Sequence, residues 1–198
     1  MEDKVLIKKL KLKDEDAFKI LVEKFKGSIF NTCLSIIQNV DDADDLTQDV
    51  FIQIYKSINH FKEKSSISTW IYRITISKAY EYIRYKKRQK RFSILTNLFR
   101  EDGSSIDVPD FEHPGVILER KESSKFLFNA IEKLNFNQKT AYILKNIQGM
   151  PYSKISQIME KSVSSIESLI FRAKKNLKTE LEKNWITRND YFWHLNFR

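Results

Sequence analysis

Apolar residues recur at steps of three and four along most of this chain, and that spacing constrains the fold more than any other feature. It is typical of amphipathic α-helices, which bury one stripe and expose the remaining surface. Glycine (4 residues) and proline (3 residues) are scarce in the 198 residues, so few helices would be interrupted. The sequence therefore predicts an all-α protein.

Composition narrows the class of protein further. The 35 Lys and Arg residues outnumber the 26 Asp and Glu residues, and the resulting net charge of +9 predicts a polyanionic partner. Cys33 is the one cysteine and lies in an apolar run, which predicts a buried thiol. One cysteine cannot form a disulfide within the chain, which fits a reducing cytoplasm. No stretch approaches 18 apolar residues and the N-terminus lacks a signal-peptide core, so we expect neither secretion nor a membrane span.

An acidic helix is predicted over residues 41–60. Its apolar residues would form one buried stripe of Ala43, Leu46, Val50, Ile54 and Ile58. The segment carries five aspartates and one lysine, although the whole chain is cationic. Acidic residues in the first turns can simply complement the helix dipole. If the face binds a partner, its charge predicts a basic protein surface, because nucleic acid would be repelled.

Two apolar helices are predicted before the acidic one. Residues 4–26 show helical spacing, with Asp14 as a candidate N-cap, and Gly27 is expected to end that helix. The second would cover residues 28–38.

A strongly basic helix is predicted from about Thr69 to Arg91, after a polar loop at residues 62–68 and an N-cap at Ser68 or Thr69. Residues 61–91 carry ten basic and two acidic side chains. Aromatic residues alternate with these cations: Trp70, Tyr80, Tyr82 and Tyr85. Cations for phosphates and rings for base stacking are what single-stranded nucleic acid binding requires. The alternative is a solvated helix end with half-buried tyrosines.

One apolar face of this basic helix should pack on the acidic helix, through Tyr72, Ile76, Ala79 and Ile83. Residues 92–122 then lose the helical spacing. Residues 101–115 hold two of the three prolines, two of the four glycines and no Lys or Arg, which predicts a flexible linker. Extended, the whole stretch 92–122 would reach on the order of 100 Å, more than two turns of B-DNA at roughly 70 Å.

The second module is predicted to begin near Leu118 with two helices. They are expected to bury Phe126, Leu127, Ala130, Ile131 and Leu134, and then Ala141, Tyr142, Leu144 and Ile147. Pro151 is placed at the start of a short helix over residues 152–159. A turn at residues 160–162 leads to a longer helix with a buried stripe of Val163, Ile166, Ile170, Ala173 and Leu177. This order is the helix-turn-helix plan; the alternative is an αα-hairpin in a plain bundle.

Taken together, the two modules resemble the extracytoplasmic-function (ECF) group of the sigma-70 family, the bacterial RNA polymerase sigma factors. The segment DADDLTQDVF at residues 42–51 resembles the region 2 signature Asp-Ala-Glu-Asp-Leu-x-Gln-Glu-x-Phe, and STWIYRI at 68–74 matches the start of the family's next helix. Residues 152–156 and 162–177 resemble region 4. The resemblance implies a region 2-like domain (1–92), a linker (93–117), a region 4-like helix-turn-helix domain (118–183) and a C-terminal tail (184–198).

The resemblance also implies roles for individual residues. The acidic helix would dock on the clamp helices of the polymerase β′ subunit through Asp42, Asp44, Asp45, Gln48 and Asp49. The loop and basic helix would bind the melted −10 element through Lys62, Lys64, Ser66, Trp70, Arg73, Ser77, Tyr80, Arg84, Lys87 and Arg88. The last helix would enter the −35 major groove through Ser162, Ser164, Ser165, Ser168, Arg172 and Lys175. The polymerase β flap and an anti-sigma factor are further implied partners.

The chain departs from the family pattern in two places. Ser77 and Glu81 stand where relatives often have Asn and Asp. Positions that are often basic or His in region 4 are here Glu167, Leu169 and Phe171. Base contacts at these positions are therefore left open; Glu167 could accept from a cytosine amine or repel phosphate.

The resulting hypothesis is a cytoplasmic sigma factor that selects promoters for RNA polymerase and is not itself an enzyme, with no cofactor, metal or small-molecule substrate. The alternative is a stand-alone helix-turn-helix transcriptional regulator, which would bind its operator without polymerase. A nucleic-acid enzyme is a distant third alternative. His60, His113 and His194 show no metal-ligand spacing, and no carboxylate set accompanies a nucleophile, so the sequence offers no catalytic site for it.

Overall fold

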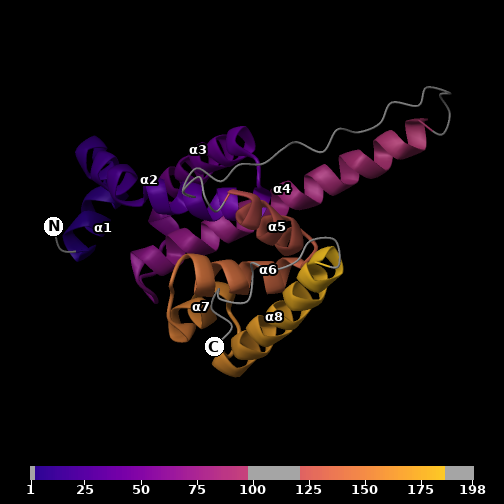
Figure 1. The fold of residues 1–198 in the computed structure, drawn as a ribbon. Helices are drawn as coiled ribbons and strands as arrows, with labels where there is room; N and C mark the ends of the chain where they lie inside the picture. The colour runs from indigo at the N-terminus through magenta and orange to yellow at the C-terminus, as the bar shows by residue number, and fades with distance from the viewer. Residues whose placement is uncertain (1–2, 98–120, 186–198) are drawn as a thin grey trace. The chain divides into compact units, whose positions relative to one another are not determined.

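The computed structural model describes residues 3–97 and 121–185, and every element in these ranges is helical (Figure 1). The all-α class expected from the sequence is confirmed. The chain divides into two compact units, Met1–Asp110 and Phe111–Arg198. The predicted linker and tail fall largely outside the described residues, and the predicted domain limits stay predictions.

The first unit contains α1 (Asp3–Lys11), α2 (Glu15–Ile37), α3 (Val40–Ser57), the 3₁₀ turn η1 (Ile58–His60) and α4 (Ile67–Asn97). Helices α2, α3 and α4 pack on one another, and α1 packs on α2 (Figure 1). The stripe predicted on the acidic helix forms much of this core, since Ala43, Val50 and Ile54 are fully buried. Asn39 caps α3 by accepting a hydrogen bond from the Asp42 N–H at 2.9 Å.

The first helical stretch breaks earlier than predicted. Asp14 caps α2 as expected, accepting from the Ala17 N–H at 2.7 Å. The break lies just before it, at Lys13, whose φ of 62° is left-handed. Gly27, predicted to end the helix, lies inside α2, so that prediction was wrong. A single glycine costs a helix only about 0.5–1 kcal/mol, less than burial of Leu21 and Ile29 on either side contributes.

Helix α4 begins two residues before its predicted start and extends to Asn97 rather than Arg91. The predicted N-cap, Ser68 or Thr69, was wrong: the Ser66 hydroxyl accepts from the Thr69 N–H at 3.1 Å. Ile67 is the first residue of α4 and is buried, so packing in the core favours a helix that begins at this residue. Ser66 therefore ends the loop and caps the helix at once.

Cys33 is fully buried, as the sequence predicts, and burial raises the pKa of its thiol to about 12. Because only the thiolate is nucleophilic, we expect no reaction with a thiol reagent in the native protein and one equivalent after denaturation. The unfolded thiol ionises near its ordinary pKa of 9.0, so stability should fall as the pH rises from about 9 toward 12. Denaturation midpoints at pH 8 and pH 10 would check the sign.

The second unit contains α5 (Lys121–Glu132), α6 (Phe136–Tyr142), the π turn η3 (Ile143–Ile147), α7 (Tyr152–Met159) and α8 (Val163–Trp185). Helices α5, α6 and α7 each pack on α8 (Figure 1). Most predicted core positions are buried, including Ile131, Leu144, Ile166 and Leu177. Pro151 precedes α7 as predicted, and Ser162 caps α8 by accepting from the Ser165 N–H at 3.2 Å.

Three positions predicted to be buried in this unit are exposed: Phe126 (45%), Ile147 (37%) and Val163 (41%). Phe128 is buried where Phe126 was expected, because only one of the two can face α8. The π turn shifts the register after Tyr142, which moves Ile147 off the buried stripe. Val163 is the first residue of α8, beyond the reach of the helices that cover Ile166.

Two glycines should respond oppositely to alanine substitution. Gly27→Ala meets no atom within 4 Å of the added Cβ and should stabilise the first unit by about 0.5–1 kcal/mol. Gly149 has a φ of +66°, so Gly149→Ala should destabilise the second unit by about 1–2 kcal/mol. Chemical denaturation of the two variants checks both signs, and equal shifts in one direction would contradict this account.

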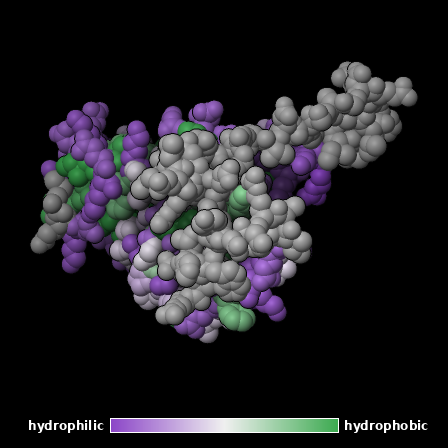
Figure 2. Space-filling model, in the orientation of Figure 1, coloured by the Kyte–Doolittle hydropathy of each residue, from purple (hydrophilic) through white to green (hydrophobic). Residues whose placement is uncertain are grey.

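Apolar side chains gather on the surface of the first unit over α1 and α2 (Figure 2). The large exposed apolar residues of α1, α2 and the turn between them are Val5, Leu12 and Ile20. None of the helices in the described ranges is long and apolar enough to span a bilayer.

Candidate nucleic-acid and protein interfaces

The outer face of α3 is acidic. Asp44, Asp45, Gln48 and Asp49 are exposed, and the buried stripe on the opposite side fixes this orientation. The Gln48 side-chain amide donates to the Asp44 carboxylate at 3.0 Å, so these two residues form one polar group. Ile52 continues the same face and is 49% exposed. The face therefore combines three exposed carboxylates with an apolar contact, a surface suited to a basic protein partner.

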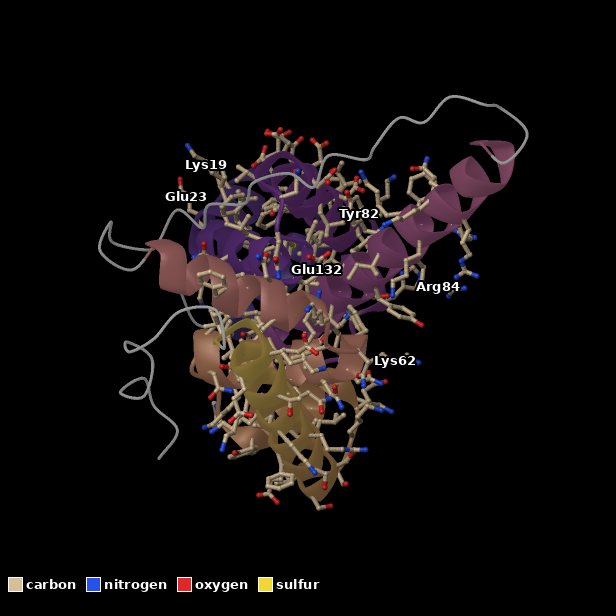
Figure 3. All side chains as sticks on the ribbon, turned by 45° about the vertical axis from the view of Figure 1, so that its right-hand side comes forward. Lys19, Glu23, Lys62, Tyr82, Arg84 and Glu132 are labelled. Atoms are coloured by element: carbon tan, nitrogen blue, oxygen red, sulfur yellow. The ribbon has the colours of Figure 1, made fainter. Side chains whose placement is uncertain are left out.

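Asp42 is separate from this group. It is half-buried, and its carboxylate lies 3.6 Å from the Lys86 ammonium of α4. The Tyr82 hydroxyl is buried beside them, and burial raises the pKa of Tyr82, with Asp42 adding to the increase. Tyr82 and Arg84 lie on opposite sides of α4 (Figure 3). Asp42 thus contacts the basic helix, although the sequence grouped it with the acids of the outer face.

The other side of α4 carries the exposed cation Arg84 (Figure 3). Lys87 and Arg88 are also exposed, and their spacing of three and four from Arg84 puts them on the same side of the helix. The Tyr80 ring is 43% exposed, and the Arg84 guanidinium lies 5.6 Å from its centroid. Ser77 is exposed one turn earlier, while Arg73 is half-buried. Cations and an exposed ring therefore share one helical surface, the combination that single-stranded nucleic acid binding uses.

The loop before α4 presents two more cations, since Lys62 and Lys64 are exposed on either side of Glu63. Trp70, predicted to bind DNA, is half-buried and packs on Phe61, with ring centroids 5.0 Å apart. That contact joins the beginning of the loop to the first turn of α4. The Trp70 ring therefore has a structural role as well as any part in binding.

Helices α7 and α8 are joined by a tight turn. Glu160 ends α7 in a left-handed conformation, with a φ of 52°. The Ser156 hydroxyl donates to the Lys161 carbonyl at 2.6 Å, which fixes the turn against α7. Both helices bury their apolar faces, including Ile155, Ile158 and Ile170. The predicted helix-turn-helix geometry is therefore present, with α8 as its longer second helix.

The outer side of α8 bears the predicted DNA-binding residues. Ser164, Ser168, Arg172 and Lys175 are exposed and follow steps of three and four. Ser162 is exposed and Ser165 half-buried at the start of the helix. The Arg172 Nε donates to the Ser168 carbonyl at 3.1 Å, which holds the guanidinium along the outer face. Small polar residues thus come first and cations follow, an arrangement suited to a major groove.

Two residues of α8 that depart from the family pattern, Leu169 and Phe171, differ in exposure. Leu169 is 8% exposed and belongs to the core, so it is not available to DNA. Phe171 is 70% exposed and lies on the line from Ser168 to Lys175. The sequence prediction omitted Phe171, although its spacing of three and four from those two residues was a usable signal. Within the described ranges, no three His, Cys, Asp or Glu residues are grouped as a metal site would require.

Comparison with known families identifies both modules. Residues 21–89 match the family model Sigma-70 region 2, and residues 127–177 match the model Sigma-70, region 4. The two matches occur in order and together cover more than half of the chain. The chain belongs to the sigma-70 family. Its curated relatives place it in the ECF group of sigma factors.

Two of these relatives match nearly the full length of the sigma factor. The ECF RNA polymerase sigma-E factor of Haemophilus influenzae is 27% identical over 186 residues, which cover 92% of this chain and 96% of the relative. The RNA polymerase sigma-H factor of Pseudomonas aeruginosa is 27% identical over 185 residues, covering 91% and 94%.

Solved structures share the fold of the sigma factor. CnrH, in complex with the cytosolic domain of CnrY, matches with a TM-score of 0.64 and 20% identity over 92% of this chain and 98% of CnrH. The sigma factor RpoE from Bartonella quintana, in complex with the anti-sigma factor NepR, matches with a TM-score of 0.62 and 22% identity, covering 83% and 96%.

Proposed function

We propose that this sigma factor binds core RNA polymerase through α3 and directs it to promoters, with α4 and its preceding loop at the −10 element and α8 at the −35 element. The observation that carries the proposal is the division of charge: one acidic helix face in a cationic chain, and cationic faces on helices of both units. The chain would act as a specificity subunit, and RNA synthesis would remain the chemistry of the polymerase.

The polymerase contact is assigned to Asp44, Asp45, Gln48 and Asp49. Their exposure and their rigid backing by the core of the first unit support this assignment. Complementary charge speeds association and rejects wrong partners, so a basic surface on the β′ clamp helices would suit this face. Asp42 would lie at the edge of the interface, since Lys86 already pairs with it.

The −10 contact is assigned to the cations of α4 and the loop, with Tyr80 as the stacking ring. Unstacking a base from a duplex costs a few kcal/mol, and stacking it on an aromatic ring returns about 1–3 kcal/mol. These two free energies roughly cancel, so contacts with phosphates must supply the net favourable free energy of binding. Arg84, Lys87 and Arg88 on α4, with Lys62 and Lys64 in the loop, are exposed and suited to supply it.

The −35 contact is assigned to the outer line of α8. Arg172 suits bidentate recognition of guanine, and the exposed Phe171 ring suits apolar contact with a thymine methyl group. Lys175, one turn beyond Phe171, suits a phosphate. Ser162, Ser164, Ser165 and Ser168 have hydroxyls small enough for close approach of the helix start to the groove.

An anti-sigma factor is the further proposed partner. The Bartonella RpoE was solved with the anti-sigma factor NepR, and CnrH with the cytosolic domain of CnrY. By analogy, this chain would be held inactive in the cytoplasm until such a partner releases it. The β flap of the polymerase would contact the second unit.

Run-off transcription tests the proposed function. Core polymerase with this chain, on a library of genomic fragments, should give transcripts with discrete start sites that core polymerase alone does not give. The upstream sequences of those fragments would define the −10 and −35 elements. If the chain adds no start site to those of core polymerase, the proposal fails.

A further inference from the structure

The proposed −10 loop contains an acid between its two lysines. Glu63 separates Lys62 from Lys64, and its φ of 57° is left-handed, a conformation that a residue with a side chain adopts only at a cost. A carboxylate at this point would also repel the phosphates that the lysines are proposed to bind. A contact from elsewhere in the unit is therefore needed to offset the Glu63 charge and to hold the residue in this conformation.

Lys11, the last residue of α1, is that partner. Its ammonium lies 2.5 Å from the Glu63 carboxylate, although the two residues are 52 positions apart. Helix α1 is itself well anchored, because Leu6, Ile7 and Leu10 are buried and the helix packs on α2 and η1.

The end of α1 is fixed by a second contact. Lys13 follows the helix, its ammonium donates to the Tyr55 carbonyl, and the same ammonium lies 3.9 Å from the Tyr55 ring centroid. The Tyr55 ring packs in turn on Phe18, with centroids 5.2 Å apart. Lys11 is therefore held at a fixed point relative to α3 and η1, from which the loop departs.

We propose that α1 braces the −10 loop, with Lys11 as a positioning residue. The inference rests on the proposed function, which assigns this loop to the −10 element. Lys11 neutralises Glu63 and keeps its carboxylate toward α1, which leaves Lys62 and Lys64 as the charges that the loop offers to phosphate. The two ends of the loop are fixed separately, by Phe61 on Trp70 and by the Ser66 cap.

The pair acts on binding rather than on folding. The Lys11 and Glu63 side chains are 33% and 46% exposed, and ion pairs with this much solvent contribute little to stability. Variants at Lys11 should therefore fold and associate with polymerase normally, so a loss of −10 affinity can be measured without loss of the protein.

The test uses holoenzyme and a forked promoter fragment whose non-template −10 strand is single-stranded, at fixed salt. Lys11→Glu should weaken binding about five- to tenfold, since it replaces an attraction by a repulsion. Lys9→Glu is the matched control, because Lys9 is exposed on the same helix and the charge change is identical. Its effect should stay under about twofold. Equal losses in the two variants would show a general field effect and overturn the brace.

Two further variants separate positioning from charge. Lys11→Arg keeps the ion pair and should bind like the native chain. The double variant Lys11→Glu/Glu63→Lys reverses the pair, and a cycle with both single variants should give clear non-additivity. Additive effects, or a loss in Lys11→Arg equal to that in Lys11→Glu, would overturn the inference.

The double variant Lys62→Ala/Lys64→Ala distinguishes this inference from the proposed function. If it leaves −10 binding unchanged, the assignment of the loop fails, and the brace fails with it. If it weakens binding while Lys11→Glu does not, the proposed function stands and only the brace is contradicted.

Discussion

Reversing Asp45 and Asp49 to lysine is expected to abolish capture of core polymerase. Both carboxylates are exposed on the outer face of α3. Placing cations against a basic partner surface costs several kcal/mol, so affinity should fall on the order of 100-fold or more. Neither residue is in the first turn of α3, where the helix dipole acts most strongly, so folding should be preserved. Pull-down with tagged core polymerase, alongside the helical circular-dichroism signal, measures both quantities.

A matched control makes this result specific. Glu23→Lys/Glu132→Lys changes the net charge by the same amount at two exposed positions on α2 and α5 (Figure 3). Neither residue belongs to a proposed interface, so this variant should still capture polymerase. Retained capture by Asp45→Lys/Asp49→Lys would remove the docking assignment, and equal losses in both variants would reduce it to an effect of overall charge.

Replacing Arg172 by alanine is expected to cause the second large loss, in recognition of the −35 element. The guanidinium lies on the exposed line of α8, where its hydrogen bond to the Ser168 carbonyl holds it outward. A bidentate contact to a base contributes about 1–3 kcal/mol of discrimination, so the native preference at one base pair should fall roughly 5- to 150-fold. Holoenzyme binding to fragments substituted at each −35 position measures this preference.

Lys175→Ala serves as the comparison for Arg172→Ala. As a phosphate contact, Lys175 should affect all sequences about equally and reduce the dependence of binding on salt. A uniform loss in Arg172→Ala would assign Arg172 to phosphate as well. No loss at all would remove α8 from the −35 contact.

The sequence predicted those features that depend on local periodicity. The acidic helix, its buried stripe and the Asp14 cap follow from spacing and capping chemistry that act within a few residues. The helix-turn-helix was also predictable, because Pro151 marks the start of its first helix and the turn at residues 160–162 separates its two helices. Errors arose where tertiary packing overrides a local rule. Gly27 lies within a helix because its neighbours are buried.

Contacts between distant residues could not be predicted in this way. The Lys11–Glu63 and Asp42–Lys86 pairs join residues 52 and 44 positions apart, and only packing of the helices brings them together. The same holds for Trp70, whose contact with Phe61 depends on the path of the loop. Phe171 differs, because its helical spacing from Ser168 and Lys175 was present in the sequence and its exposure is what the structure adds.

The account depends on promoter recognition that requires polymerase. Footprinting on a promoter found by run-off transcription, with this chain alone, core polymerase alone and both together, tests that requirement most directly. We predict specific protection of the −10 and −35 elements only when both are present. Specific protection by the chain alone at physiological salt would instead identify a stand-alone regulator and contradict the account.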